Sequence, residues 1–176
     1  MRKVLYILGE LSDDDIEWMI IAGEKKILEV GETLIWEGRT ADGLYILLSG
    51  KLTVIGKTNL QIAALERGEI TGEMSILEAR TPNASVKAIT PAVVLVIPRY
   101  AVQKRLDTNV GFAARFYKAM SLFLSDRLRN TTEQLLSADD HARINDMDEL
   151  DDKVLENIYL AGTRFETMMK RLLEEG

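Results

Sequence analysis

The sequence contains no cysteine and a single histidine, His141, among its 176 residues. Without cysteine, a disulfide framework, a thiolate zinc site and a cysteine nucleophile are all excluded. One histidine leaves almost no material for a histidine-based triad or a metal cluster. Carboxylates are numerous, but no pair is placed opposite a nucleophile, and solvated surface is where such side chains usually lie. We therefore expect no catalytic residue, no metal site and no enzyme.

Positive charge and long apolar runs are also scarce. The formal net charge of −6 argues against a nucleic-acid surface, which needs a basic face. The apolar run Val4–Leu8 is too short for a signal peptide or a membrane span. The sequence therefore predicts a cytoplasmic protein that binds neither nucleic acid nor a membrane.

Turn residues and apolar runs divide the first hundred residues into a helix and a series of strands. Ser12, followed by three aspartates, is typical of a helix start, and this helix should end near Gly23. Seven of the twelve glycines lie between Gly31 and Gly72, where they punctuate short strands. The expected strands are Leu44–Leu48, Leu52–Ile55 and Leu60–Ala64 as a hairpin, and Val93–Ile97. Such regular spacing predicts a sandwich or a jelly-roll barrel.

After the last expected strand, the sequence again has the features of helices. Pro98 is placed to begin a short helix through Leu106. Apolar residues then recur every three or four positions and predict a long helix over about Asn109 to Leu136. Its apolar stripe either packs only on the strand domain or lies between two copies of the chain. The width of the stripe favours the second interpretation, a homodimer seam.

The last forty residues change composition abruptly. Residues 137–152 carry seven acids and one base, Arg143, and predict a solvated linker. A calcium loop at Asp146-Met147-Asp148 is the weaker interpretation, because the required glycine and terminal glutamate are missing. An amphipathic helix over Lys153–Glu174 follows. The expected organisation is a domain at 1–136, a linker at 137–152 and a C-terminal helix at 153–176.

The stretch Ile70–Ala88, ITGEMSILEARTPNASVKA, combines the features of an anion-binding site. Gly72 lets the backbone approach a ligand or take a positive φ without steric cost. The helix-compatible run Glu73–Leu77 places free amides just beyond it. A polar loop with Pro82 follows and leads into Asn83-Ala84-Ser85. Together these features predict a phosphate cradle.

This stretch resembles the phosphate-binding cassette of the cyclic-nucleotide-binding domain family, of the catabolite-activator-like type. The positions that fit the family pattern are Gly72, Glu73, Met74, Ser75, Leu77, Pro82, Ala84, Ser85, Val86 and Ala88. Gly31–Ile35, Gly43–Gly50 and Leu65–Glu69 also resemble segments of the family's roll.

The resemblance implies an α+β fold built on a jelly-roll-like β-barrel, the cyclic-nucleotide-binding β-roll. An N-terminal helix, a long lid or dimer helix and a C-terminal amphipathic helix would surround the roll. DNA-binding relatives carry a winged helix-turn-helix after the lid helix. Here the remaining residues are too few and too acidic for one, so we expect no DNA-binding domain.

The resemblance also implies a set of ligand-binding residues. They are Gly72, Glu73, Met74, Ser75, Arg80, Asn83, Ala84 and Ser85. Glu73 occupies the position of the acidic residue that, in the family, accepts a hydrogen bond from the ribose 2′-hydroxyl. The alternative is that Glu73 is an acid at a helix start, where the helix dipole favours it. Asn83 departs from the pattern, because the family has its phosphate-binding arginine there and a neutral amide offers no bidentate, charge-assisted fork. Arg80 either replaces that charge or is a solvent-exposed loop residue.

The function implied is that of a non-enzymatic regulatory or sensor module without a cofactor. It would bind a cyclic mononucleotide, cyclic AMP or cyclic GMP, or a related phosphate ligand, and signal through its C-terminal helices to a protein partner. The alternative is a degenerate, ligand-free fold that serves as a protein-interaction scaffold. Asn83 favours the scaffold, whereas Gly72, Glu73 and Ser85 favour the sensor.

Overall fold

A computed structural model describes residues 3–57, 59–78, 80–137 and 152–173. Most of the expected linker, including His141, lies outside the described residues. No helix in the described part of the chain is both long and apolar enough to cross a membrane.

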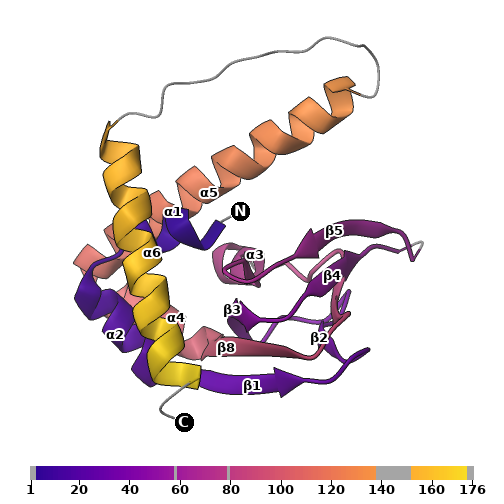
Figure 1. Ribbon diagram of the computed structural model, residues 1–176, viewed down its shortest axis with the longest axis horizontal. Coiled ribbons are helices and arrows are strands. Elements are labelled where there is room, and N and C mark those ends of the chain that lie inside the picture. The colour runs from indigo at the N-terminus through magenta and orange to yellow at the C-terminus, as the bar shows by residue number, and fades with distance from the viewer. Residues whose placement is uncertain (1–2, 58, 79, 138–151, 174–176) are drawn as a thin grey trace.

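Helices flank a set of eight strands (Figure 1). The helices are α1 (Lys3–Glu10), α2 (Asp13–Ala22), α3 (Glu73–Leu77), α4 (Arg99–Thr108), α5 (Val110–Ser137) and α6 (Asp152–Leu173). The strands are β1 (Glu24–Leu28), β2 (Thr33–Ile35), β3 (Gly43–Ser49), β4 (Leu52–Ile55), β5 (Gln61–Leu65), β6 (Ile70–Thr71), β7 (Ser85–Ala88) and β8 (Ala92–Pro98).

The strands form two four-stranded antiparallel sheets, ordered β1-β8-β3-β6 and β2-β7-β4-β5. The predicted hairpin is present, with Leu52 opposite Leu65 and Thr53 opposite Ala64. The arrangement is the predicted β-roll with flanking helices, which confirms the α+β fold class.

Strand β3 shows why the run Leu44–Leu48 is apolar at every position. Successive side chains of a strand point to opposite faces. Leu44 and Ile46 enter a hydrophobic core shared with the helices, whereas Tyr45 and Leu47 enter the core between the two sheets. A strand buried on both faces needs apolar residues without alternation.

The helix predicted at Ser12 begins as expected. The side chain of Ser12 accepts a hydrogen bond from the backbone N–H of Asp15, and the carboxylate of Asp15 accepts one from the backbone N–H of Ser12. This reciprocal pair is a capping box, and it satisfies two backbone donors at the start of α2. The helix ends before Gly23, which is also the predicted end.

The packing of α5 shows where the first part of its predicted apolar stripe lies. Phe112, Phe116, Met120 and Phe123 are at most 2% exposed and lie in the core shared with α1 and α2. Of the two interpretations, packing within the chain is therefore the one observed for these side chains. Leu124 and Leu128, further along the same stripe, are 37% and 68% exposed. A homodimer through the second half of α5 therefore stays a prediction.

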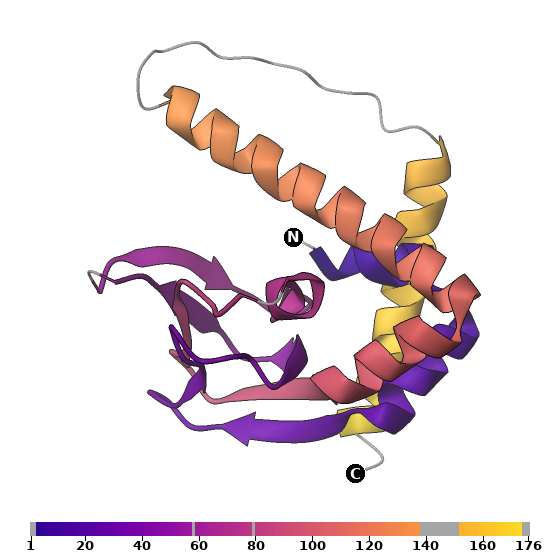
Figure 2. The ribbon, with the colours of Figure 1, turned by 180° about the vertical axis from the view of Figure 1, so that it is seen from behind.

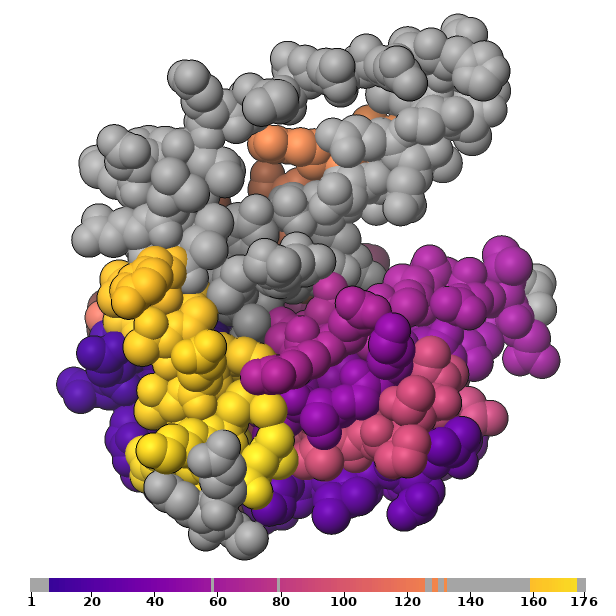
Figure 3. All heavy atoms as spheres, in the orientation of Figure 1, coloured from indigo at the N-terminus to yellow at the C-terminus, as the bar shows by residue number. Residues whose placement is uncertain are grey.

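Helix α6 packs on α1 and α2, which lie far from it in the sequence (Figures 1 and 2). Its Ala161, Phe165 and Met168 are buried in the same core as the aromatic residues of α5. Figure 3 shows α6 lying against the N-terminal helices on one side and the roll on the other. The amphipathic stripe predicted for this segment is thus covered by the chain itself.

Arg164 holds α6 to the end of α1. Its guanidinium donates to the backbone oxygens of Leu8 and Gly9 at 2.8 and 3.3 Å and forms an ion pair with Asp13 at 2.7 Å. Because the last carbonyls of a helix lack partners within it, this arginine satisfies groups that α1 leaves open.

Candidate functional site

The backbone of the predicted phosphate cradle turns at Gly72, between β6 and α3. Gly72 has φ +87°, in the left-handed region that side chains rarely adopt. A Cβ there would collide with the backbone oxygen of Gly43 and lie 2.8 Å from the ring of Tyr45. Any other residue at this position is therefore disfavoured for two reasons, the positive φ and the steric overlap of its Cβ with Gly43 and Tyr45.

The three residues after Gly72 form the first turn of α3 and differ in exposure. Glu73 and Ser75 are each 3% exposed, whereas Met74 is 49% exposed. A carboxylate this deeply buried is uncommon unless it has a specific role or partner. The burial of Glu73 is compatible with both interpretations given above, the contact with a ribose hydroxyl and the acid at a helix start.

The loop that carries Arg80 and Asn83 lies at the surface. The side chain of Arg80 is 88% exposed, and its Nε lies 3.6 Å from the carboxylate of Glu78. Asn83 is exposed, while Ala84 and Ser85 are partly buried. The structure thus shows Arg80 as an exposed loop residue, with its charge facing another side chain of the same loop.

Hydrogen bonds connect the loop between β2 and β3 to the loop between α3 and β7, here called the cassette loop. The sequence did not predict this connection. Ser85 accepts a hydrogen bond on Oγ from the backbone N–H of Glu37 at 3.0 Å. The backbone N–H of Gly38 donates to the oxygen of Pro82 at 2.9 Å. The hydroxyl hydrogen of Ser85 is still able to donate to a ligand. Pairs so distant in sequence leave no local pattern from which they could be found.

Tyr45 is the second residue of the site that the sequence did not indicate. It is 4% exposed, and its hydroxyl oxygen accepts a hydrogen bond from the backbone N–H of Asp42 at 3.2 Å. Burial raises the pKa of this phenol, so it stays neutral. Its ring forms the wall against which Gly72 is packed.

Helix α3 connects the cradle to the helical part of the molecule. Ile76 is 8% exposed and belongs to the same core as Val102 of α4, Phe112 of α5 and Phe165 of α6. Because this core is closely packed, a displacement of α3 would disturb the core that α4, α5 and α6 share.

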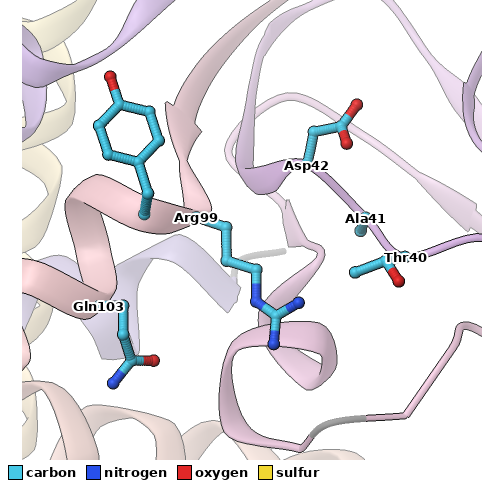
Figure 4. Close-up of a pocket in the computed structure, with 6 residues that line it drawn as sticks. Thr40, Ala41, Asp42, Arg99 and Gln103 are labelled. Carbon is cyan, nitrogen blue, oxygen red and sulfur yellow. The ribbon is translucent and has the colours of Figure 1, made fainter.

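A shallow hollow of about 490 Å³ lies beside this region, at the start of α4 (Figure 4). It is lined by Thr40, Ala41, Asp42, Arg99, Tyr100 and Gln103. None of the predicted ligand-binding residues lines it. Within the described residues, no group of three or more histidine, aspartate or glutamate side chains is placed to hold a metal ion.

The comparisons with known proteins point to one domain. A family model described as cyclic nucleotide-binding domain matches residues 25–109. Glutaminase 2 of Bradyrhizobium diazoefficiens is 32% identical over 136 residues, which are 75% of this chain and 21% of that protein. The chain therefore spans about a fifth of the length of this relative.

Solved structures share the fold. A cyclic nucleotide-binding domain from Methylobacillus flagellatus has a TM-score of 0.69 at 22% identity and covers 81% of this chain and 85% of its own. The regulatory subunit of a cAMP-independent protein kinase A from Trypanosoma brucei has a TM-score of 0.61 at 19% identity, over 75% of this chain and 45% of its own. At these identities the likeness is one of fold.

Proposed function

Because residues 25–109 place this chain in the cyclic nucleotide-binding domain family, we propose that it is a non-enzymatic regulatory module. Its cradle, Gly72–Ser85, binds a cyclic mononucleotide, cyclic AMP or cyclic GMP, or a related phosphate ligand. The module is cytoplasmic, needs no cofactor and passes the signal to a protein partner through its helices.

The observation that carries this proposal is the backbone of the cradle. Gly72 holds a left-handed turn in a position closed to any side chain, and Glu73 and Ser75 are buried directly behind it. A glycine takes this conformation without steric cost and lets a ligand approach the backbone of the turn closely. A ligand that contacts the turn would explain why the closed position at Gly72 and the buried Glu73 and Ser75 stand next to each other.

The cradle lacks the phosphate-binding arginine of the family pattern, so we expect it to bind its ligand weakly. Asn83 supplies one amide donor group in place of an arginine fork. Each hydrogen bond to a charged group contributes roughly 1.5–3 kcal/mol, so the missing fork weakens binding by about ten- to several-hundred-fold. Arg80 is free to exchange Glu78 for a phosphate, because an exposed ion pair of this kind stabilises by only about 0–1 kcal/mol.

The signalling part of the proposal rests on Ile76. A ligand that draws α3 toward the cassette loop moves a side chain of the hydrophobic core to which Val102, Phe112 and Phe165 also belong. Packed cores respond to such shifts by changing between discrete arrangements. The positions of α4, α5 and α6 would then differ between the free and the bound chain, and a partner that contacts one of them would read the difference.

Calorimetric titration with cyclic AMP and with cyclic GMP tests the proposal. Wild type should bind at least one nucleotide, and Glu73→Gln should weaken binding while Glu66→Gln, at an exposed carboxylate paired with Lys51, should not. Absence of heat and of NMR shifts with both nucleotides at millimolar concentration would count against the sensor.

The ligand-free scaffold remains the second candidate, and one observation favours it. Neither Asn83 nor Arg80 is held in a position to receive a phosphate, since both are exposed and Arg80 faces Glu78. A relative in fold is itself described as cAMP-independent. Under this alternative the roll would serve as a fixed platform for a protein partner.

A further inference from the structure

The four strands at the sheet edges of the described chain are β1, β2, β5 and β6. An edge strand exposes unpaired backbone N–H and C=O groups, and proteins usually protect it with charges or by keeping it short. β6 has two residues and β2 has three. β1 carries Glu24, Lys25 and Lys26, and the ammonium of Lys25 also donates to the oxygen of Leu172 in α6.

Within the described residues, β5 is neither charged nor unusually short, although its register against β4 shifts between Gln61 and Ala63. It is five residues long and is paired on one side only, with β4. From Thr58 to Leu65 the chain carries neither a charge nor a proline. Leu60 and Ile62 are 67% and 61% exposed. Figures 1 and 2 place β5 at the margin of the roll, on the side away from α1, α2 and α6.

We propose that this edge binds the same edge of a second copy of the chain, with the two β5 strands antiparallel. Pairing about Ala63 uses the whole strand, because Gln61 then faces the partner's Leu65 and Ile62 faces the partner's Ala64. A second copy fits because it brings an uncharged strand, so that no like charges meet. Two copies of β1 paired about Lys26 would instead place that lysine opposite itself, which is destabilising.

The exposed faces of the strands support the pairing. Ile62 and Ala64 are both exposed, whereas Leu65 is buried. In the dimer each Ile62 packs beside the partner's Ala64, which removes apolar surface from water twice. One strand pair buries less than the ~1,200 Å² of a standard stable interface, so the association is weak and depends on concentration.

Light scattering over a concentration series tests the dimer with a matched pair of variants. Ile62→Lys puts two lysines in each strand pair, at diagonal positions about 7–8 Å apart, and should weaken the dimer at least ~tenfold. Ile27→Lys makes the same change on another edge strand, at a side chain that is 66% exposed, and should leave association unchanged. Equal effects of both variants would overturn the proposal.

The absence of cysteine from the natural chain allows a direct test of the register. Ala63→Cys places two thiols on the two-fold axis, where directly opposed Cα atoms lie about 4.5–5.5 Å apart, within the range of a disulfide. Mild oxidation should yield a covalent dimer from Ala63→Cys, little from Ile27→Cys, and less from Ala63→Cys once Ile62→Lys is added.

A wild type that stays monomeric up to millimolar concentration would also overturn the proposal, and would leave β5 as an edge for a strand of a different protein. Nucleotide binding plays no part in this pairing. A failed dimer therefore says nothing against the cradle, and a failed titration says nothing against the dimer.

Discussion

Asp15, at the start of α2, and Arg115, in the first half of α5, form an ion pair across one hundred residues of sequence, in which the aspartate is buried and the arginine is 38% exposed. The guanidinium Nε of Arg115 lies 2.7 Å from one carboxylate oxygen of Asp15, and a second nitrogen lies 3.2 Å from the other. Asp15 is 1% exposed. Arg105 of α4 approaches the same carboxylate at 3.4 Å, so three helices meet at one charge.

This pair predicts a loss of stability in acid. Burial by itself raises the pKa of Asp15, but hydrogen bonds from Arg115 and Ser12 outweigh it and lower the pKa from 3.8 to about 2. Because the pKa of Asp15 is lower in the folded than in the unfolded chain, the ionised carboxylate stabilises the fold at pH values above about 4. This contribution, about 2 kcal/mol, is lost as the pH falls from about 4 to 2.

Chemical denaturation of wild type and Asp15→Asn at pH 7 and at low pH measures this contribution. The variant should be less stable at pH 7, because two arginines lose their partner. The difference between the two proteins should shrink as Asp15 becomes protonated. A difference that is independent of pH would contradict the assignment.

Substitution of Gly72 and of Gly38 by alanine separates the free-energy cost of a positive φ from the cost of steric overlap. Both have positive φ, but a Cβ at Gly38 meets no atom within 4 Å, whereas one at Gly72 meets Gly43 and Tyr45. Gly38→Ala should therefore cost only the conformational strain, about 1–2 kcal/mol. Gly72→Ala should cost more and should also impair nucleotide binding. Thermal unfolding of both variants measures the difference, and equal costs would mean that Gly72 is not confined by its neighbours.

The parts of the fold that the sequence predicts are those with local causes. β3 is marked by an apolar run between two turns, and α3 was expected at its observed bounds from the residues after Gly72. α1 was not predicted, although Val4, Ile7, Leu8 and Leu11 recur at helical spacing. Its apolar surface is explained only by α5 and α6, which cover it.

The same limit applies to the cradle, whose role as a binding site stays a proposal; its turn at Gly72 and the short helix after it are as predicted. The glycine of the turn and the acid after it follow from local chemistry. The bond between Ser85 and Glu37 and the contact of Tyr45 with Gly72 depend on how distant strands fold together. No periodicity or spacing in the sequence indicates such pairs.

Two aromatic residues of α6 differ in burial, and substituting each of them tests whether this helix is part of the core. Phe165 is 8% exposed, and the guanidinium of Arg67 lies 5.6 Å from its ring centroid, whereas Tyr159 on the same helix is 77% exposed. Phe165→Ala should destabilise the chain by about 3 kcal/mol or more. Tyr159→Ala should change stability by less than about 0.5 kcal/mol.

Removal of residues 152–176 should have a larger effect than Phe165→Ala, because it exposes the apolar surface of α1. The acidic linker alone would suggest that the roll folds independently of α6; the shared core indicates the opposite. A truncated chain that unfolds cooperatively with the stability of wild type would show that α6 is a dispensable attachment.

The last prediction concerns the charge of the cradle. Asn83→Arg should supply the bidentate phosphate contact and tighten cyclic-nucleotide binding at least ~tenfold, or about 1.4 kcal/mol. Thr81→Arg adds the same charge to the same exposed loop and serves as the control for a general electrostatic effect. If Arg80 already contacts the phosphate, Arg80→Ala should abolish binding and Asn83→Arg should add little, since two cations would compete for one phosphate. Calorimetric titration of the three variants and of wild type distinguishes these cases. If none of them binds cyclic AMP or cyclic GMP, the cradle holds no cyclic nucleotide, and the roll acts as a scaffold whose turn at Gly72 serves the packing of Tyr45 alone.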